Sequence, residues 1–288
     1  MKKFTIKLWA VLLLMLVSLQ TFATDNEYGL KDNIQDGVIL HCFDWTYAQI
    51  KEELPNIAAA GFSAVQTSPA HPREPVGAAW YMLYQPYDYK VGGNGLGTKE
   101  GLTELCTEAH QYGVKIIVDV VANHTNGSLS YVASFWQDQS LYHDYQGGID
   151  YSNRWQVTHG RIGMWDLKTE DSRVQEKIKE YVAELKSCGV DGIRWDAAKH
   201  IGLPSEGDTF WQNVPDQTMY NYGEILDGTS GDDTVSEKVE VVSQTTGVQL
   251  HPVAGESSAK AMIYNLQGQR VDANYRGVVV CNGRKYVQ

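Results

Sequence analysis

The sequence predicts an α/β fold in which parallel strands alternate with helices. Apolar runs typical of buried strands lie at residues 37–45, 64–68, 114–121 and 192–197. Between these runs apolar residues recur at helical spacing, and a glycine follows each helical segment. Repeated strand–helix–strand units favour right-handed crossovers on one parallel sheet.

The helices come in order between these strands. They cover residues 48–60, 99–112 and 173–188, and the glycines that end them are Gly61, Gly113 and Gly189. Glycine suits these places because the residue after a helix often takes a left-handed backbone conformation. The strands are nearly continuous apolar runs, as expected where helices cover a parallel sheet.

Two long insertions break the alternation, and both follow the carboxyl end of a strand. They are residues 69–97 and 124–165. Aromatic side chains are abundant in both: Trp80, Tyr81, Tyr84, Tyr87, Tyr89, Tyr131, Phe135, Trp136, Tyr142, Tyr145, Tyr151 and Trp155. Loops at this end of the strands build the active site of a β/α barrel. Any single ring could instead pack a small subdomain, but so many together favour a carbohydrate cleft.

The stretch Gly192-Ile-Arg-Trp-Asp-Ala-Ala-Lys-His200 places charged groups at the end of a buried strand. Successive side chains of a strand face opposite ways, so Arg194 and Asp196 should project from the same face. A guanidinium there would lower the pKa of Asp196 and keep it ionised, as suits a nucleophile or an electrostatic stabiliser. Taken alone, these residues favour a structural ion pair that caps a helix.

The N-terminus has the features of an export signal. Lysines precede an apolar run at residues 8–17, and small residues follow it, so residues 1–23 are expected to be a signal peptide that is cleaved. The run is short for a membrane span, and we expect a secreted or cell-surface protein. The mature chain would carry 21 basic and 35 acidic side chains, a net charge near −14, which disfavours nucleic acid as a partner.

The cysteines indicate neither a disulfide framework nor a metal site on sulfur. They are Cys42, Cys106, Cys188 and Cys281, far apart in sequence and without zinc-ligand spacing. We expect buried free thiols.

Three motifs that end successive strands resemble those of the α-amylase family of glycoside hydrolases. They are Asp119-Val-Val-Ala-Asn-His124, residues 192–200 and Tyr222-Gly-Glu-Ile-Leu226, in the family's order. The resemblance runs from about residue 37 to residue 233. It implies a (β/α)8 TIM-type barrel with a small domain inserted after the third strand.

The resemblance implies retaining hydrolysis of α-1,4-glucosidic bonds in starch or maltooligosaccharides. Asp196 would be the nucleophile that forms a glycosyl-enzyme intermediate, with Arg194 beside it. Glu224 would protonate the leaving oxygen and then activate water. This chemistry needs carboxyl groups about 5–5.5 Å apart, which neighbouring strands of a barrel can supply.

Other matched positions are implied to bind sugar or a structural calcium ion. The expected sugar-binding residues are Trp80, Tyr81, Gln85, His124, Arg194, Lys199 and His200. Calcium, which prefers oxygen ligands, would be held by Asn123, Asp166 and the backbone carbonyl of His200. Gln156 stands where some members have an aspartate, so weaker binding is expected. The remaining tyrosines of the first insertion are expected to pack: Tyr84, Tyr87 and Tyr89.

The sequence departs from the family after Glu224. The family continues with strands 6 to 8 and a His-Asp motif whose aspartate stabilises the transition state, whereas the His-Asp pair of this chain, His143-Asp144, lies in the inserted segment. We therefore expect a partial barrel of five strands, open and marginally stable, with unpaired edges at its first and last strands. Its activity should be impaired.

The C-terminal end predicts a small β module, because alternating apolar runs are separated by Gln267-Gly268 and Asn282-Gly283 at hairpin positions. It is similar to the sorting tails of secreted Bacteroidetes proteins, which implies contact with secretion machinery, although a plain β module is the alternative. The expected domains are residues 1–23 (signal peptide), 24–227 (incomplete barrel, with an inserted domain at about 124–165), 228–247 (linker) and 248–288 (sorting tail).

Two other functions remain open. A starch-binding module without turnover would retain the aromatic loops and could lack the third carboxylate. A remnant of a disrupted amylase gene is the second alternative. The sequence has no nucleotide-binding glycine loop, zinc-helix motif or nucleophilic Cys–His motif that would favour another chemistry.

Overall fold

The computed structural model describes residues 26–73 and 79–225 and five short strands further along the chain. The expected signal peptide and most of the expected linker and tail lie outside the described residues. In the described part, no helix combines the length and the apolar character needed to cross a membrane.

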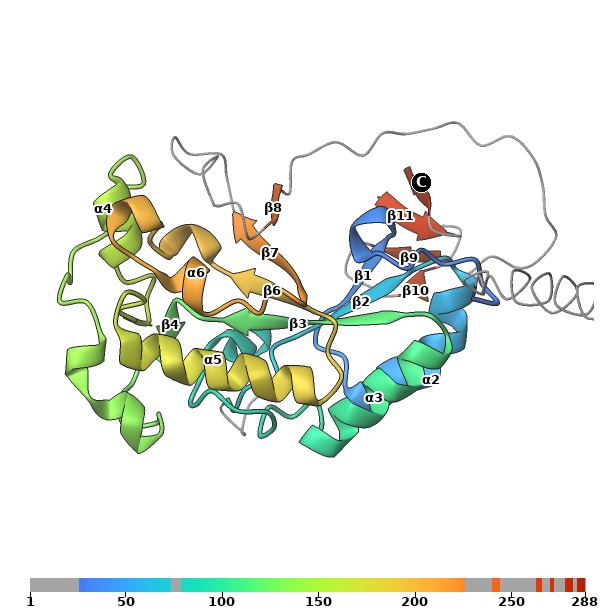
Figure 1. The fold of residues 1–288 in the computed structure, drawn as a ribbon, viewed down its shortest axis with the longest axis horizontal. Coiled ribbons are helices and arrows are strands. Elements are labelled where there is room, and N and C mark those ends of the chain that lie inside the picture. Colours follow the sequence, from blue (N-terminus) through green and yellow to red (C-terminus); the bar gives the residue numbers. More distant parts are fainter. Residues whose placement is uncertain are drawn as a thin grey trace, which may run out of the picture.

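A parallel sheet forms the centre of the fold (Figure 1). Its strands, in spatial order, are β1 (Ile39–Cys42), β2 (Ala64–Thr67), β3 (Lys115–Val121), β6 (Gly192–Asp196), β7 (Tyr220–Ile225) and β8 (Glu240–Ser243). Each neighbouring pair runs parallel. The first five strands confirm the expected α/β sheet. Among the described residues the sheet stays open, with β1 at one edge and β8 at the other.

The sheet has one strand more than the five expected. Strand β8 lies within residues 228–247, where a linker was expected, and it places Glu240 opposite Tyr222. Without β8, the edge of β7 would present unpaired backbone N–H and C=O groups, and the run Val-Glu-Val-Val at residues 239–242 has the composition of a strand. The expectation that β7 would be an unpaired edge was therefore wrong.

Three helices connect the strands and lie along one side of the sheet (Figure 1). They are α2 (Tyr47–Ala59), α3 (Lys99–Gln111) and α5 (Ser172–Ser187). Their N-terminal caps are the side chains of Thr46, Thr98 and Asp171, each of which accepts a hydrogen bond from the first helical turn. Gly61, Gly113 and Gly189 follow them in the left-handed conformation, as expected.

The alternation of side chains along the strands separates the core from a second, inner face. Leu40, Val65, Val118, Ile193 and other residues of one face join the helices in the main hydrophobic core. The opposite face carries a small separate cluster of Ile34, Ala64, Ile117 and Tyr222. Ile34 comes from the short η1 (Ile34–Asp36). This cluster does not occupy the part of the inner face toward the carboxyl ends of the strands, where a functional site can form.

The insertions form short elements at the carboxyl ends of the strands. The first contains η2 (Trp80–Tyr84). In the second, β4 (His124–Thr125) pairs antiparallel with β5 (Trp165–Asp166) and encloses η3 (Ser134–Gln137), η4 (Gln139–Leu141) and α4 (Arg154–His159). After β6 come η5 (Ala198–His200), η6 (Pro204–Glu206) and α6 (Phe210–Asn213). The second insertion follows β3, as expected of the inserted domain.

The described C-terminal strands make a separate antiparallel sheet. It consists of β9 (Ile263–Asn265), β10 (Arg270–Val271), β11 (Val278–Cys281) and β12 (Arg284–Val287), in the order β10-β9-β11-β12. The expected β module is present, while its role as a sorting tail stays a prediction. Cys42, Cys106 and Cys188 are buried free thiols, as expected.

Candidate active site

The polar residues of the inner face come from five neighbouring strands. Because side chains alternate along a strand, every second residue of β1, β2, β3, β6 and β7 points to the same side of the sheet. The register sets Asp119 opposite Arg194 and Arg194 opposite Tyr222. His41, Gln66, Asp119, Arg194 and Tyr222 lie on this face, and Asp196 and Glu224 follow two residues further along β6 and β7.

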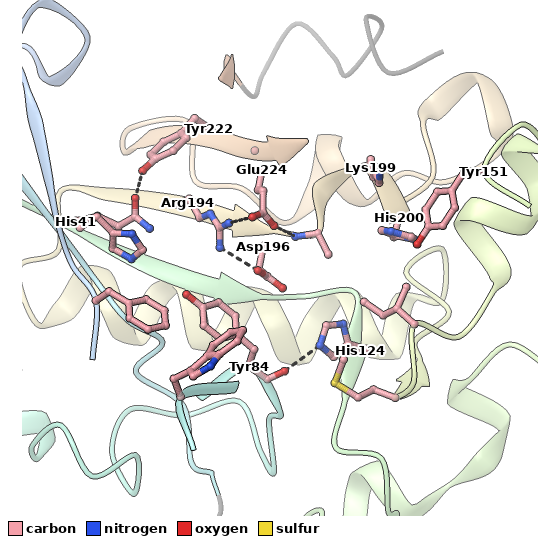
Figure 2. A pocket seen from close by; sticks show the side chains of 17 residues that line it. His41, Tyr84, His124, Tyr151, Arg194, Asp196, Lys199, His200, Tyr222 and Glu224 are labelled. Atoms are coloured by element: carbon pink, nitrogen blue, oxygen red, sulfur yellow. Dashed lines mark hydrogen bonds and ion pairs between the residues drawn. The ribbon is translucent and has the colours of Figure 1, made fainter. Parts of the chain in front are cut away.

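Arg194 is the centre of the site. Its Nη1 lies 2.6 and 2.7 Å from the two carboxylate oxygens of Asp119 and 2.9 Å from Asp196 Oδ1. Its Nη2 lies 2.5 Å from Glu224 Oε1. One guanidinium thus joins carboxylates from three adjacent strands, and it holds the side chains of Asp196 and Glu224 beside each other (Figure 2).

Burial reverses the effect expected on the pKa of Asp196. Burial raises the pKa of Asp196 well above its ordinary range; Arg194 opposes this, but Asp119 and Glu224 add to it. The expectation from the sequence was a lowered pKa, and it was wrong because it left out the burial of Asp196 and counted Arg194 as the partner of Asp196 alone. Three carboxylates divide one positive charge, so part of their negative charge is uncompensated.

Asp119 supports Arg194 from below and has no exposed surface. Besides Arg194, it accepts a hydrogen bond from Tyr84 Oη at 2.8 Å. Burial raises the pKa of Asp119, against the lowering effects of Arg194 and Tyr84. Asp119 therefore positions the guanidinium from beneath the pocket.

Tyr222 Oη donates to Gln66 Oε1 at 2.5 Å, so the side chains of β7 and β2 meet across the inner face.

The backbone after Asp196 helps to hold Glu224. Ala197 has a left-handed conformation with φ of 50°, which is uncommon for a residue other than glycine. Its N–H donates to Glu224 Oε2 at 3.2 Å. Unusual backbone at a functional position is commonly retained because it places a group for function. In this chain it turns β6 into η5, which carries Lys199 and His200.

A pocket of about 910 Å³ opens over these groups (Figure 2). The expected site residues that line it are Asp196, Glu224, Arg194, Trp80, His124, Lys199 and His200. Its wall also includes aromatic and apolar residues, with Tyr151 from the inserted domain and Met164 just before β5. A concave site with apolar walls and a few converging polar groups is typical of a ligand-binding cleft.

Two expected sugar-binding residues lie outside this lining. Tyr81 is exposed and packs edge-on against Trp80, with 6.0 Å between ring centroids. Gln85 accepts a hydrogen bond from Asn126 at 3.1 Å through its amide oxygen. Tyr81 is therefore beside the pocket, where a longer ligand could reach it, whereas Gln85 is engaged with the inserted domain.

Several lining residues are not among the site residues named from the sequence: His41, Phe43, Gln66, Tyr84, Tyr151 and Tyr222. Tyr84 was expected to pack, but it lines the pocket and binds Asp119. Tyr89, in contrast, is buried as expected and donates to the carbonyl of His124 at 2.9 Å. The alternation of residues along the strands could have pointed to two of them. His41 and Gln66 alternate with apolar residues in strands that otherwise contain few polar groups.

The expected histidine of the site, His124, is held in one orientation. Its Nε2 donates to the carbonyl oxygen of Tyr84 at 2.9 Å. Burial lowers the pKa of His124 to about 4, so its ring is neutral near pH 7. A neutral ring in the wall of the pocket suits hydrogen bonding to a hydroxyl group rather than to an anion.

The residues expected to hold calcium converge beside the pocket. Asn123 Nδ2 donates to Asp166 Oδ1 at 3.0 Å and to the carbonyl oxygen of His200 at 3.2 Å. If the amide were turned over, its oxygen would face the same two oxygens, and the nitrogen and oxygen of an amide occupy the same shape. These three oxygens would suit a hard cation.

The charge around these oxygens is small. In the part of the chain that is described, no three His, Cys, Asp or Glu side chains gather as a metal-binding group. Burial raises the pKa of Asp166 to about 6, and its Oδ2 lies 2.6 Å from His143. The amide oxygen of Gln156 accepts from the N–H of Asp150. The donor set therefore fits calcium in kind and supplies one carboxylate.

The His143-Asp144 pair has no part in the pocket. His143 is buried, with its two ring nitrogens 2.6 Å from Asp166 and 3.2 Å from Glu170. Burial lowers the pKa of His143, but its bonds to these carboxylates outweigh burial and raise the pKa to about 9. Neither His143 nor Asp144 lines the pocket.

Comparisons with known proteins agree with this geometry. The family model described as the catalytic domain of alpha amylase matches residues 44–277. An α-amylase of Clostridium acetobutylicum is 40% identical over 227 residues, which cover 72% of this chain and 30% of that protein. An α-amylase of Butyrivibrio fibrisolvens is 32% identical over 247 residues, covering 72% of this chain and 25% of that protein.

Solved structures show the same fold. An α-amylase from Malbranchea cinnamomea is 26% identical, with a TM-score of 0.58 over 67% of this chain and 48% of that one. A mutant of α-amylase I from Eisenia fetida, solved with maltohexaose, is 23% identical, with a TM-score of 0.63 over 71% of this chain and 48% of that one. The chain thus spans less than a third of the length of the two bacterial amylases and about half of each solved chain.

Proposed function

The chain belongs to the α-amylase family, and on that premise we propose that it hydrolyses α-1,4-glucosidic bonds of starch-like glucans with retention of configuration. The observation that carries this proposal is the single guanidinium of Arg194, joined to both Asp196 and Glu224 in the wall of the pocket. Retaining glycosidases use two carboxyl groups held close together. Burial and family membership together favour this role over a structural ion pair.

In the proposed mechanism, Asp196 attacks the anomeric carbon while Glu224 protonates the leaving glycosidic oxygen. Water activated by Glu224 then releases the sugar from Asp196. Arg194 holds the two carboxyl groups in place, and the N–H of Ala197 supports Glu224. Attack requires Asp196 to be ionised, so its raised pKa restricts the reaction to the higher part of the pH range.

The pocket wall supports a sugar ligand. Trp80 is exposed at the pocket and could stack on a pyranose ring, with Tyr81 beside it. The Lys199 ammonium lies 4.8 Å from the centre of the Tyr151 ring, and both residues line the pocket. His124 and His200 supply further hydrogen-bonding groups in the lining. We propose that the pocket binds several glucose units of a maltooligosaccharide.

We propose that turnover by this chain is slow. The sequence after Glu224 lacks the family's His-Asp motif, and the His143-Asp144 pair does not reach the pocket. A missing group that stabilises developing charge typically lowers the rate by about 10²–10³-fold. A starch-binding module without turnover is the second candidate function, favoured by this missing group together with the exposed ring of Trp80.

The test is release of reducing ends from soluble starch by the purified full chain. Weak release is expected, and Asp196→Asn should abolish it, while Asp144→Asn, an exposed aspartate outside the pocket, should leave it unchanged. Release that survives Asp196→Asn would refute the catalytic assignment. Binding of maltoheptaose by calorimetry without any product would instead select the binding module.

A calcium ion is proposed as a structural group at Asn123, Asp166 and the His200 carbonyl. When bound, it would neutralise Asp166 and fasten the inserted domain to η5, which lines the pocket. The convergence of these oxygens supports the proposal. The single carboxylate argues for weak affinity.

Export is proposed from residues 1–23, with the C-terminal module as a sorting signal for secretion machinery or surface attachment. Expression of the full chain in a host with the matching secretion system, followed by N-terminal sequencing of the released protein, tests both. A mature protein that begins at residue 24 is expected. Intracellular retention with an intact N-terminus would contradict the proposal.

A further inference from the structure

We propose that Trp155 and Tyr145, outside the pocket, form a second binding site for polymeric α-glucan. The identity of the ligand rests on the proposed function, whereas the site itself rests on geometry. Trp155 lies in α4 of the inserted domain, its side chain is 54% exposed, and it does not line the pocket. We call Trp155, Tyr145 and the supporting His159 the Trp155 platform.

The platform presents exposed aromatic surface. Trp155 stacks on His159 with 4.7 Å between centroids and 20° between planes, which covers one face of the indole, while the residue stays 54% exposed. Tyr145 stands edge-on beside it, with centroids 5.4 Å apart and planes at 73°. A flat open ring next to an upright one suits the apolar face of a pyranose and its edge hydroxyl groups.

Hydrogen bonds fix the platform before any ligand arrives. Gln156 Oε1 accepts from the N–H of Asp150 at 2.8 Å, which fastens the turn that carries Tyr145 to α4. Tyr145 Oη donates to the carbonyl of Gly148 at 3.1 Å. Gly147 allows this close packing, because a Cβ there would collide with the same Oη. Rings held in place lose little conformational entropy on binding, which favours affinity.

The charge of the platform favours a neutral ligand. The cation of α4, Arg154, is neutralised by Glu206, with contacts of 2.8 and 3.0 Å. Burial lowers the pKa of His159, helped by the neighbouring His143, so its ring is neutral near pH 7. Because Arg154 is paired and the His159 ring is neutral, these two groups favour a neutral polyhydroxylated polymer over a phosphate or an acidic peptide.

The platform is fastened to the wall of the pocket. The guanidinium of Arg154 donates to the carbonyl oxygens of Lys199 and Ile201, in the segment that lines the pocket at Lys199. Trp155 directly follows Arg154 in α4. A polymer held at Trp155 is therefore kept near the pocket, which raises the effective concentration of its glucose units there.

The test compares adsorption of the full chain to granular starch with its affinity for maltotriose, a ligand short enough for the pocket alone. Trp155→Ala should weaken adsorption about three- to tenfold, as expected for loss of one aromatic contact, while maltotriose affinity changes less than twofold. Trp80→Ala should show the opposite pattern. Tyr131→Ala, which removes an exposed ring stacked on Tyr87 elsewhere on the surface, is the matched control and should change neither.

Each result decides the proposal. If the Trp155→Ala chain adsorbs like the wild type, or if the wild type does not adsorb, the platform is not a glucan site. Adsorption that depends on Trp155 in a chain without turnover would support the platform and refute the proposed hydrolysis. If Trp155→Ala fails to fold by thermal melt, Tyr145→Ala takes its place, and unchanged adsorption by that variant overturns the proposal.

Discussion

Arg194 donates from a single nitrogen, Nη1, to both oxygens of the fully buried Asp119 at 2.6 and 2.7 Å. This contact lies one level below the pocket, and it fixes the guanidinium whose other contacts are Asp196 and Glu224. The candidate catalytic pair is thus aligned from β3, a strand that contributes neither of the two carboxylates. A substitution of Asp119 should therefore disturb the positions of both Asp196 and Glu224.

Replacing Arg194 should affect stability and turnover together. Arg194→Met leaves three carboxylates around an apolar side chain, and removal of one partner from a buried ion pair costs about 3–5 kcal/mol. Arg194→Lys keeps the charge but not the planar fork, so we expect a smaller loss of stability and turnover about 10²-fold lower. Urea unfolding and starch hydrolysis measure the two effects. A lysine variant with unchanged turnover would show that alignment by the fork is not needed.

The two carboxylates should differ in chemical rescue. Glu224→Ala removes the acid, so turnover of starch should fall by about 10³-fold or more, but a substrate with an acidic aryl leaving group needs less protonation and should lose much less. Asp196→Ala should lose activity on both substrates because the nucleophile is absent. Equal losses for the two variants on the aryl substrate would contradict the assigned roles.

The sequence was sufficient for the five strands and three helices of the expected sheet because their patterns are long and regular. It also located Asp196 and Glu224 at the ends of neighbouring strands. Other residues of the inner face were missed. His41 and Tyr222 can be recognised as neighbours of this pair only once the strand register is known. Strand β8 was missed because its pairing depends on the open edge of β7, which is a tertiary property.

The direction of the Asp196 pKa could not be predicted from Arg194-x-Asp196. The sequence shows one cation two residues from one carboxylate, whereas the fold adds Asp119 from β3 and Glu224 from β7 to the same guanidinium. The pKa depends on the sum of these charges and on burial, both of which are set by register and packing.

Asp196 should make stability and activity respond to pH in opposite ways. Its folded pKa is raised by burial and by Asp119 and Glu224, so its contribution to stability is fully present below the unfolded pKa and is lost as pH rises through the folded value. Asp196→Asn should therefore unfold at higher urea than the wild type at pH 7, with the difference shrinking in acid. An ordinary aspartate has a pKa of about 4. Because the pKa of Asp196 is raised, activity should be lost on acidification at a higher pH than this.

Urea titrations of both chains between pH 4 and pH 8 check the stability effect, and kcat/KM over the same range checks the activity. Asp144→Asn serves as the control, since Asp144 is exposed and outside the pocket. A variant at Asp196 that is less stable than the wild type at pH 7 would mean that the attraction to Arg194 exceeds the cost of burial.

Calcium should stabilise the chain through Asp166. At a concentration about 100 times its dissociation constant, a ligand that binds the folded state alone raises the free energy of unfolding by about 2.7 kcal/mol. We expect a rise in melting temperature with Ca2+ over EDTA, and its loss in Asp166→Asn, which retains the size of the side chain and its neighbours. Magnesium is the control ion, because it demands a tighter octahedral shell. An equal response in the variant would place calcium elsewhere.

Tyr84 should contribute to the site mainly through its hydroxyl group. Its Oη donates to Asp119 at 2.8 Å, while its ring stacks with Phe43 at 6.4 Å and 17°. Tyr84→Phe keeps the ring and removes a hydrogen bond to a buried carboxylate. The free energy of unfolding should therefore be about 1.5–3 kcal/mol lower than in the wild type. Tyr131→Phe, at a ring that is 60% exposed, should change stability by less than about 0.5 kcal/mol. If urea unfolding finds the two variants equal, the hydroxyl of Tyr84 does not support Asp119, and the alignment of Arg194 rests on its carboxylate contacts alone.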